Sequence, residues 1–177
     1  MVVDGPADVL YAAQEDVGVW RIPLQRGTPD FGRAELIARV REFGREASYD
    51  PVEEECTISA TPHPDSGTHL SADAEGLTVV RSAHRRPTLI ASSQGDSTFV
   101  EYTLGGHYLR TFAVGDGSVD SVEHSDGAAV TTEYFGRRFP TGLLVVHDGE
   151  NTPDEMVDSE VRPNTNFTFV PWGGRGR

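Results

Sequence analysis

Short β-prone runs separated by turn-forming residues recur along almost the whole chain. They are rich in Val, Thr, Tyr and Phe, and Gly, Pro, Asp or Ser clusters bound them, which is typical of strands. Starts spaced roughly ten residues apart favour a sandwich, a barrel or a propeller, so we expect an all-β fold. The runs are Val9–Ala13, Gly18–Pro23, Leu77–Arg81, Thr88–Ser92, Thr98–Leu104, Tyr108–Val114, Ala128–Glu133, Gly142–His147 and Phe167–Trp172.

One segment departs from this pattern. A helix over residues 34–43 would carry four apolar side chains on one face: Leu36, Ile37, Val40 and Phe43. Gly44 follows as a stop signal. Farther on, residues 46–71 show almost no periodicity and contain Glu53-Glu54-Glu55 among several turn formers. We therefore expect one short helix over residues 34–43 and a long loop over residues 46–71.

Charge and composition exclude several classes of function. The 177 residues carry a net charge of −13, and all 15 basic residues are Arg, which argues against a nucleic-acid partner because phosphate backbones bind basic surfaces. No apolar run approaches the roughly 20 residues of a membrane-spanning helix, and the first residues lack the basic start of an export signal. We expect no membrane partner. The single cysteine, Cys56, cannot form an internal disulfide.

Oxygen donors beside glycines lie where the expected strands meet turns. Ca²⁺ binds six to eight oxygen ligands in a flexible geometry, and neighbouring glycines let the backbone turn tightly. Carboxylates that converge without a basic partner repel one another, so a cation would suit them. Asp-Gly is also a common turn dipeptide, so plain turns remain an alternative. The stretches are Glu15-Asp16, Asp73–Gly76, Gln94–Asp96, Asp116-Gly117, Asp120, Asp126-Gly127 and Asp148–Asn151.

The order of these motifs resembles that of the calcium-dependent β-propeller phytases. The resemblance extends over nearly the whole chain and matches the C-terminal half of that family's propeller. It leaves out residues 27–68, which it implies are an insertion with a helix and a loop. It rests on several motifs at matching intervals: Leu10–Trp20, Asp73–Thr78, Ala91–Ser97, Asp116-Gly117, Ser125–Gly127, Pro140–Asn151 and Asn164–Trp172.

The resemblance implies a fold, a cofactor and a set of site residues. The expected fold is all-β, a partial (truncated) six-bladed β-propeller with one short inserted helix, so that residues 1–177 form the C-terminal part of a phytase domain. The cofactor is several Ca²⁺ ions, and the catalytic role falls to Glu75 and Asp126. The implied calcium ligands are Glu15, Asp73, Glu75, Gln94, Asp120, Asp126, Asp148, Glu150 and Asn151.

The function implied by the resemblance is calcium-dependent hydrolysis of phosphate monoesters, with phytate or another phosphorylated small molecule as substrate. Calcium would neutralise phosphate oxygens and lower the pKa of a bound water. Because the chain matches only half a propeller, we expect activity to require a second copy or a complementing N-terminal half. Two alternatives stay open, a calcium-binding module without catalysis and a propeller lactonase. The family is typically secreted, although this chain shows no export signal.

Overall fold

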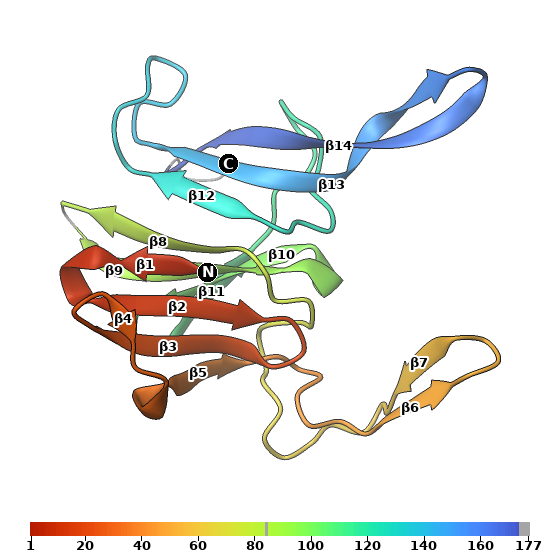
Figure 1. Ribbon diagram of the computed structural model, residues 1–177. Coiled ribbons are helices and arrows are strands. Elements are labelled where there is room, and N and C mark those ends of the chain that lie inside the picture. The colour runs from red at the N-terminus through yellow and green to blue at the C-terminus, as the bar shows by residue number, and fades with distance from the viewer. Residues whose placement is uncertain (84, 174–177) are drawn as a thin grey trace.

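β-Strands form nearly all of the regular structure and pair into antiparallel sheets that follow one another in chain order (Figure 1). The computed structural model describes residues 1–83 and 85–173. Among these residues, no helix is long and apolar enough to span a membrane. The prediction of an all-β fold is therefore confirmed.

The first sheet is built around β3, which pairs with all of β2 through residues 18–23 and with β4 and β5 at its opposite ends. A short 3-10 turn, η1 (Gly5–Ala7), joins the first two strands, and another, η2 (Phe31–Arg33), precedes the last. The strands are β1 (Val2–Asp4), β2 (Val9–Gln14), β3 (Gly18–Gln25), β4 (Thr28–Pro29) and β5 (Glu35–Arg39).

In the view of Figure 1 the third sheet lies above the first, and β8 of the second sheet lies between them. The second has four strands in the order β11-β10-β9-β8, and η3 (Gln94–Asp96) turns the chain from β9 into β10. The third has three strands in the order β12-β13-β14. Their bounds are β8 (Leu77–Ser82), β9 (Arg85–Ser93), β10 (Thr98–Thr103), β11 (Tyr108–Phe112), β12 (Ala128–Thr131), β13 (Leu143–Val157) and β14 (Glu160–Pro171).

The two inner strands of the second sheet, β9 and β10, are buried on both faces along most of their length. Successive residues of a strand point to opposite faces, so Leu89 and Ala91 pack toward the first sheet while Ile90 packs toward the third. In β10, Val100 likewise packs toward the first sheet and Phe99 packs toward the third. This double burial explains the unbroken apolar run in β9 and gives stacked sheets that succeed one another as propeller blades do.

The prediction of a helix over residues 34–43 is wrong. Residues 35–39 form the strand β5, in which Ala38 pairs with Val19 and Leu36 pairs with Trp20 of β3. An isolated helix of this length has marginal stability in water, whereas the free edge of β3 supplies backbone hydrogen bonds to an extended partner. The first part of the expected insertion therefore belongs to the first sheet.

A separate hairpin, formed by β6 (Ala47–Asp50) and β7 (Glu55–Ile58), projects from the body of the molecule (Figure 1). Every residue of the two strands is exposed to solvent. The backbone N–H of Ser59 donates to the carbonyl of Glu46 at 2.8 Å, which closes the base of the hairpin. The loop expected here is thus a two-stranded arm.

Candidate functional site

Backbone hydrogen bonds bring the acidic turns of the first and second sheets together. The N–H of Ala74 donates to the carbonyl of Glu15 at 3.2 Å, and the N–H of Gln94 donates to the carbonyl of Asp73 at the same distance. The turn between β2 and β3, the segment before β8 and the end of β9 therefore meet at one end of the sheets.

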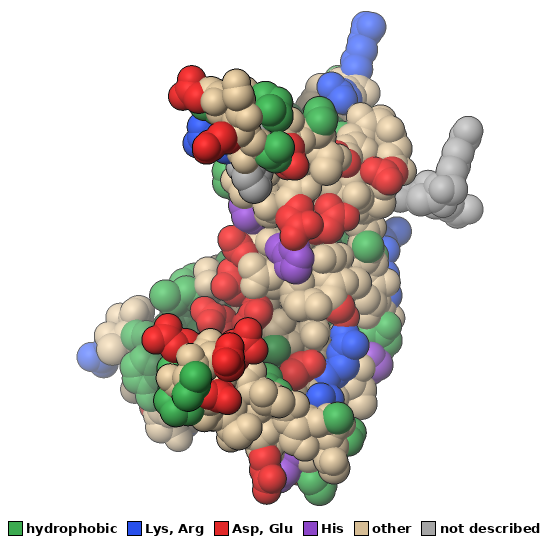
Figure 2. Space-filling view, turned by 90° about the vertical axis from the view of Figure 1, so that its right-hand side faces the viewer, with side chains coloured by type: hydrophobic (Ala, Val, Ile, Leu, Met, Phe, Trp, Pro, Cys, Tyr) green, Lys and Arg blue, Asp and Glu red, His purple; other side chains and the backbone are tan. Residues whose placement is uncertain are grey.

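The third sheet joins the same end. The hydroxyl of Ser92 donates to the carbonyl of Ser125, and both residues are buried. The N–H of His147 donates to the carbonyl of Gly127 at 3.0 Å, so the start of β12 lies beside the middle of β13. Figure 2 looks onto this end of the molecule, where Asp and Glu side chains are spread in groups with histidines among them.

Glu75 lies at the centre of this acidic end. Burial raises the pKa of the Glu75 carboxyl, and the negative charges of Asp126, Glu15 and Asp73 raise it further. Glu75 and Glu15 also line an open cavity of about 520 Å³, which they share with Asp16. Four of the acidic residues named from the sequence are thus close enough to influence one another.

Two side chains contact the carboxylate of Asp126. The Nε2 group of Gln94 donates a hydrogen bond to Oδ1 of Asp126. The Nδ1 atom of His147 lies 3.4 Å from Oδ2 of the same carboxylate, and the ring of His147 packs edge-on against Phe167 at 5.9 Å between ring centres. Asp126 is therefore the residue that links the donors of the second sheet to those of the third.

Asp148 and Glu150 form a second acidic group in β13. The side chain of Asp148 is completely buried, and its Oδ1 atom accepts the N–H groups of Glu123 and Glu150 at 3.4 and 3.3 Å. Its Oδ2 atom has no hydrogen-bond partner among the described residues. Glu150 is exposed and pairs with Nε2 of His124 at 3.2 Å.

Asp120 and Asn151 lie together in a third group, away from Glu75. The N–H and hydroxyl groups of Thr152 donate to Oδ2 of Asp120 at 2.6 and 2.8 Å, and these bonds lower the pKa of the Asp120 carboxyl. Asn151 exchanges side-chain hydrogen bonds with Asn164 and Asn166 across the β13–β14 pair. No contact described in the structure joins this group to Glu75 or Asp126.

The carboxylate and amide oxygens of this end are ligands that suit a hard cation such as Ca²⁺. Among the described residues, their side chains do not converge on a single position in the structure. Within residues 1–83 and 85–173, no three His, Cys, Asp or Glu side chains are arranged to hold a metal ion. Two observations still fit a cation: the unpartnered buried Oδ2 atom of Asp148, and the mutual crowding that raises the pKa of Glu75. The chemistry of the donor set therefore matches calcium.

Two groups at this end were not among the site residues predicted from the sequence. His147 contacts Asp126 and precedes Asp148, and this adjacency to an expected ligand was the available signal. Ser92 and Ser125 tie the second sheet to the third, but a serine beside a strand end is common and gave no functional signal of its own.

The chain is similar to known proteins along most of its length. The family model described as Phytase matches residues 48–175. The 3-phytase of Bacillus subtilis (strain 168) is 29% identical over 175 residues, which cover 97% of this chain and 37% of that protein. The chain thus spans little more than a third of the length of this curated relative.

Proposed function

The chain belongs to the phytase family, and from that premise we propose that it carries a calcium-dependent site for hydrolysing phosphate monoesters, with phytate as substrate. The observation that carries the proposal is the gathering of Glu15, Asp73, Glu75 and Asp126 at one end of three sheets. A polyanionic substrate would be repelled by this end alone, so the proposal requires cations between protein and phosphate.

The proposed calcium ligands fall into the three groups described above. Glu15, Asp73, Glu75, Gln94 and Asp126 would hold calcium at the centre of the acidic end, with Asp148 and Glu150 of β13 beside them and with Asp120 and Asn151 in the third group. When bound, calcium neutralises phosphate oxygens and lowers the pKa of a coordinated water, which provides a nucleophile at neutral pH.

Glu75 and Asp126 are the proposed catalytic residues. Gln94 fixes one oxygen of Asp126 and His147 lies against the other, so this carboxylate is oriented before substrate arrives. Glu75 has a raised pKa, which suits its carboxyl to accept a proton released from the attacking water. Asp126 would then orient the water while Glu75 holds the proton.

The experiment that tests this proposal measures phosphate release from phytate by the 177-residue chain, with millimolar Ca²⁺ or with EGTA. We expect release that requires Ca²⁺ and falls by about a hundredfold or more in Glu75→Gln, as loss of a general base does. Glu53→Gln is the matched control, because Glu53 is exposed in the β6–β7 arm. Calcium-independent release, or equal release by Glu75→Gln, would contradict the assigned roles.

A second candidate function is a calcium-binding β module without catalysis. It is favoured by the incomplete convergence of acidic side chains in the described residues. Calorimetry separates the two functions: Ca²⁺ binding without phosphate release would support the module. Release that appears only after adding a complementing N-terminal half, or only in an oligomer, would support a shared hydrolase site.

A further inference from the structure

A cavity at the other end of the strands gathers positive charge. Arg85 begins β9, whereas the acidic turn at Gln94 follows its last residue, so the two features lie at opposite ends of the same strand. The cavity measures about 450 Å³, and Arg85, Arg86, Arg110, Glu101 and Trp172 are among the residues that line it. Three arginines against one glutamate give a local excess of positive charge in a chain of net charge −13.

Arg110 is held in position by its neighbours. Its Nε donates to Oε2 of Glu101 at 2.6 Å, and Glu101 also accepts the hydroxyl of Thr88 at 2.6 Å. The guanidinium carbon lies 5.1 Å from the ring centre of Phe112 and 5.6 Å from that of Trp172. One edge of the guanidinium is thus used for positioning, while its terminal nitrogens make no hydrogen bond within the described part of the chain.

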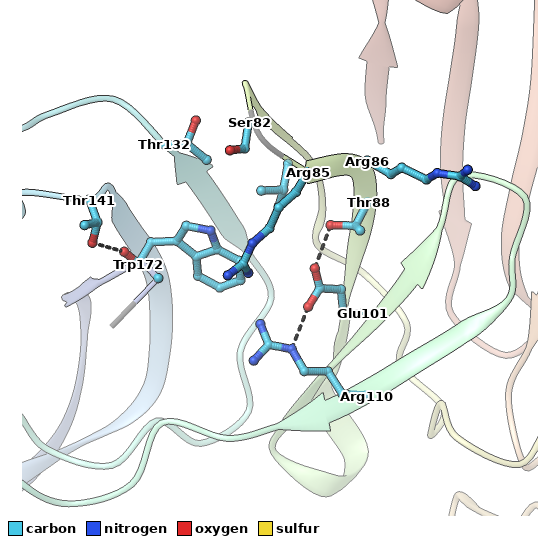
Figure 3. A pocket seen from close by; sticks show the side chains of 11 residues that line it. Ser82, Arg85, Arg86, Thr88, Glu101, Arg110, Thr132, Thr141 and Trp172 are labelled. Carbon is cyan, nitrogen blue, oxygen red and sulfur yellow. Dashed lines mark hydrogen bonds and ion pairs between the residues drawn. The ribbon is translucent and has the colours of Figure 1, made fainter. Parts of the chain in front are cut away.

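Arg85 provides a second guanidinium beside the first. Figure 3 shows the side chains of Arg85 and Arg110 both extending to the indole of Trp172, whereas the side chain of Arg86 points away from it. Arg85 is exposed, and no described residue forms an ion pair or hydrogen bond with its side chain. The hydroxyls of Thr132 and Thr141 donate to backbone carbonyls, so the arginines are the available donors.

We propose that this cavity binds the phosphate group of a small phosphorylated ring compound, with Arg85 and Arg110 holding the phosphate and Trp172 packing against the ring. Guanidinium groups present paired N–H donors that match phosphate oxygens. The cavity exceeds the volume that a phosphate group alone would fill, and the indole provides an apolar wall for the remainder of the ligand. This site goes beyond the proposed hydrolase and does not depend on calcium.

Trp172 gives a direct readout of the cavity, since the chain contains only one other tryptophan, Trp20. The experiment uses the full chain with Trp20→Phe in EGTA and titrates inorganic phosphate, glucose 6-phosphate and glucose, with emission and calorimetry as readouts. Without calcium, the acidic end repels phosphate, so binding under these conditions belongs to the arginine cavity. We expect saturable binding of both phosphates, tighter for the sugar phosphate, and none of glucose.

Arg85→Gln should weaken phosphate binding by about tenfold, because it removes one charge-assisted donor without unpairing Glu101. Arg26→Gln is the matched control, since Arg26 is an exposed arginine in the β3–β4 turn and should leave binding unchanged. Circular dichroism checks that each variant is folded, and Arg85→Lys should restore part of the affinity. The proposal is overturned if neither phosphate binds in EGTA, or if Arg85→Gln binds as tightly as Arg26→Gln.

Discussion

At the scale of single residues, Glu75 has surroundings that favour its protonated form. Burial raises the pKa of its carboxyl, and Asp126, Glu15 and Asp73 add to the effect. When the pH is below 4.5, the ordinary pKa of a Glu carboxyl, Glu75 is protonated in both the folded and the unfolded chain. The neighbouring carboxylates then do not reduce the stability of the fold. As pH rises through the higher pKa of the folded state, the charge that forms beside other carboxylates reduces stability.

Glu75→Gln should therefore stabilise the metal-free protein at pH 7. The gain over the parent chain should shrink as pH falls and vanish below about pH 4.5, where the parent carboxyl is already neutral. Urea unfolding in EGTA across this pH range measures the difference, with Glu53→Gln as the control for a simple change in net charge. If the free energy of unfolding varied with pH in parallel for Glu75→Gln and the parent chain, the neighbouring carboxylates would not destabilise ionised Glu75.

The site could be predicted from sequence only where residues lie near chain turns. Glu15, Asp73, Glu75, Gln94 and Asp126 all flank strand ends, and the structure brings them to one end of the sheets. Asp120 and Asn151 form a separate group, because Asp120 lies in the loop before β12 and its carboxylate accepts hydrogen bonds from Thr152 of β13. Local spacing in the sequence does not tell which strand such a loop contacts.

At the scale of elements, the close approach of β5 to β3 depends on Gly18. Its φ is +134°, and an added Cβ would lie 2.1 Å from the carbonyl oxygen of Ala38. Only glycine combines this backbone conformation with such contact.

Gly18→Ala should lower the free energy of unfolding by at least about 2 kcal/mol, through backbone strain and displacement of β5. Gly117→Ala is the control, because a Cβ there meets nothing within 4 Å. Urea denaturation of both variants measures the difference. Equal stability would mean that residues 35–39 do not pair closely with β3.

An ion pair between a buried carboxylate and a partly exposed arginine joins β1 to β8 across the boundary of the first two sheets. Nε of Arg81 lies 3.1 Å from Oδ1 of Asp4, whose side chain is completely buried. Removal of the arginine would leave a buried carboxylate without its cation, which is costly.

Arg81→Ala should reduce the free energy of unfolding by about 3 kcal/mol. Asp4→Asn added to that variant should recover part of the loss, since it removes the unpaired charge. Thermal unfolding of the single and double variants tests this, with Arg137→Ala as an exposed control. No recovery in the double variant would assign the loss to packing by the Arg81 side chain.

The main strands were predictable because their burial imposes a simple pattern. The nine apolar runs correspond to β2, β3 and β8–β14, although the limits of β13 and β14 extend well beyond the runs. Residues 35–39 were mistaken for a helix because their apolar spacing also fits a helical face, and only the edge of β3 decides between the two. The β6–β7 arm was missed because its exposed strands bury nothing that would impose alternation.

At the scale of the whole molecule, the third sheet ends in an unpaired edge. Within the described residues, β14 pairs only with β13, and its Phe167 and Phe169 side chains are 65% and 50% exposed. Free strand edges flanked by exposed aromatics associate with other strands.

We therefore expect the chain to self-associate as its concentration rises. Phe169→Lys should shift sedimentation toward the monomer by placing a charge beside this edge. Phe31→Lys is the matched control, since Phe31 is 72% exposed in η2, in the first sheet rather than the third. Sedimentation that is independent of concentration, or altered equally by both substitutions, would contradict association through β14.

The β6–β7 arm has a consequence for protein engineering. Its strands are wholly exposed, and its base is closed by the hydrogen bond between Ser59 and Glu46. The two chain positions are adjacent in space, as the termini of many small domains are. A foreign domain spliced between them in place of the arm would leave the stacked sheets uncut, so this chain offers a natural graft point for a fluorescent reporter or an affinity module.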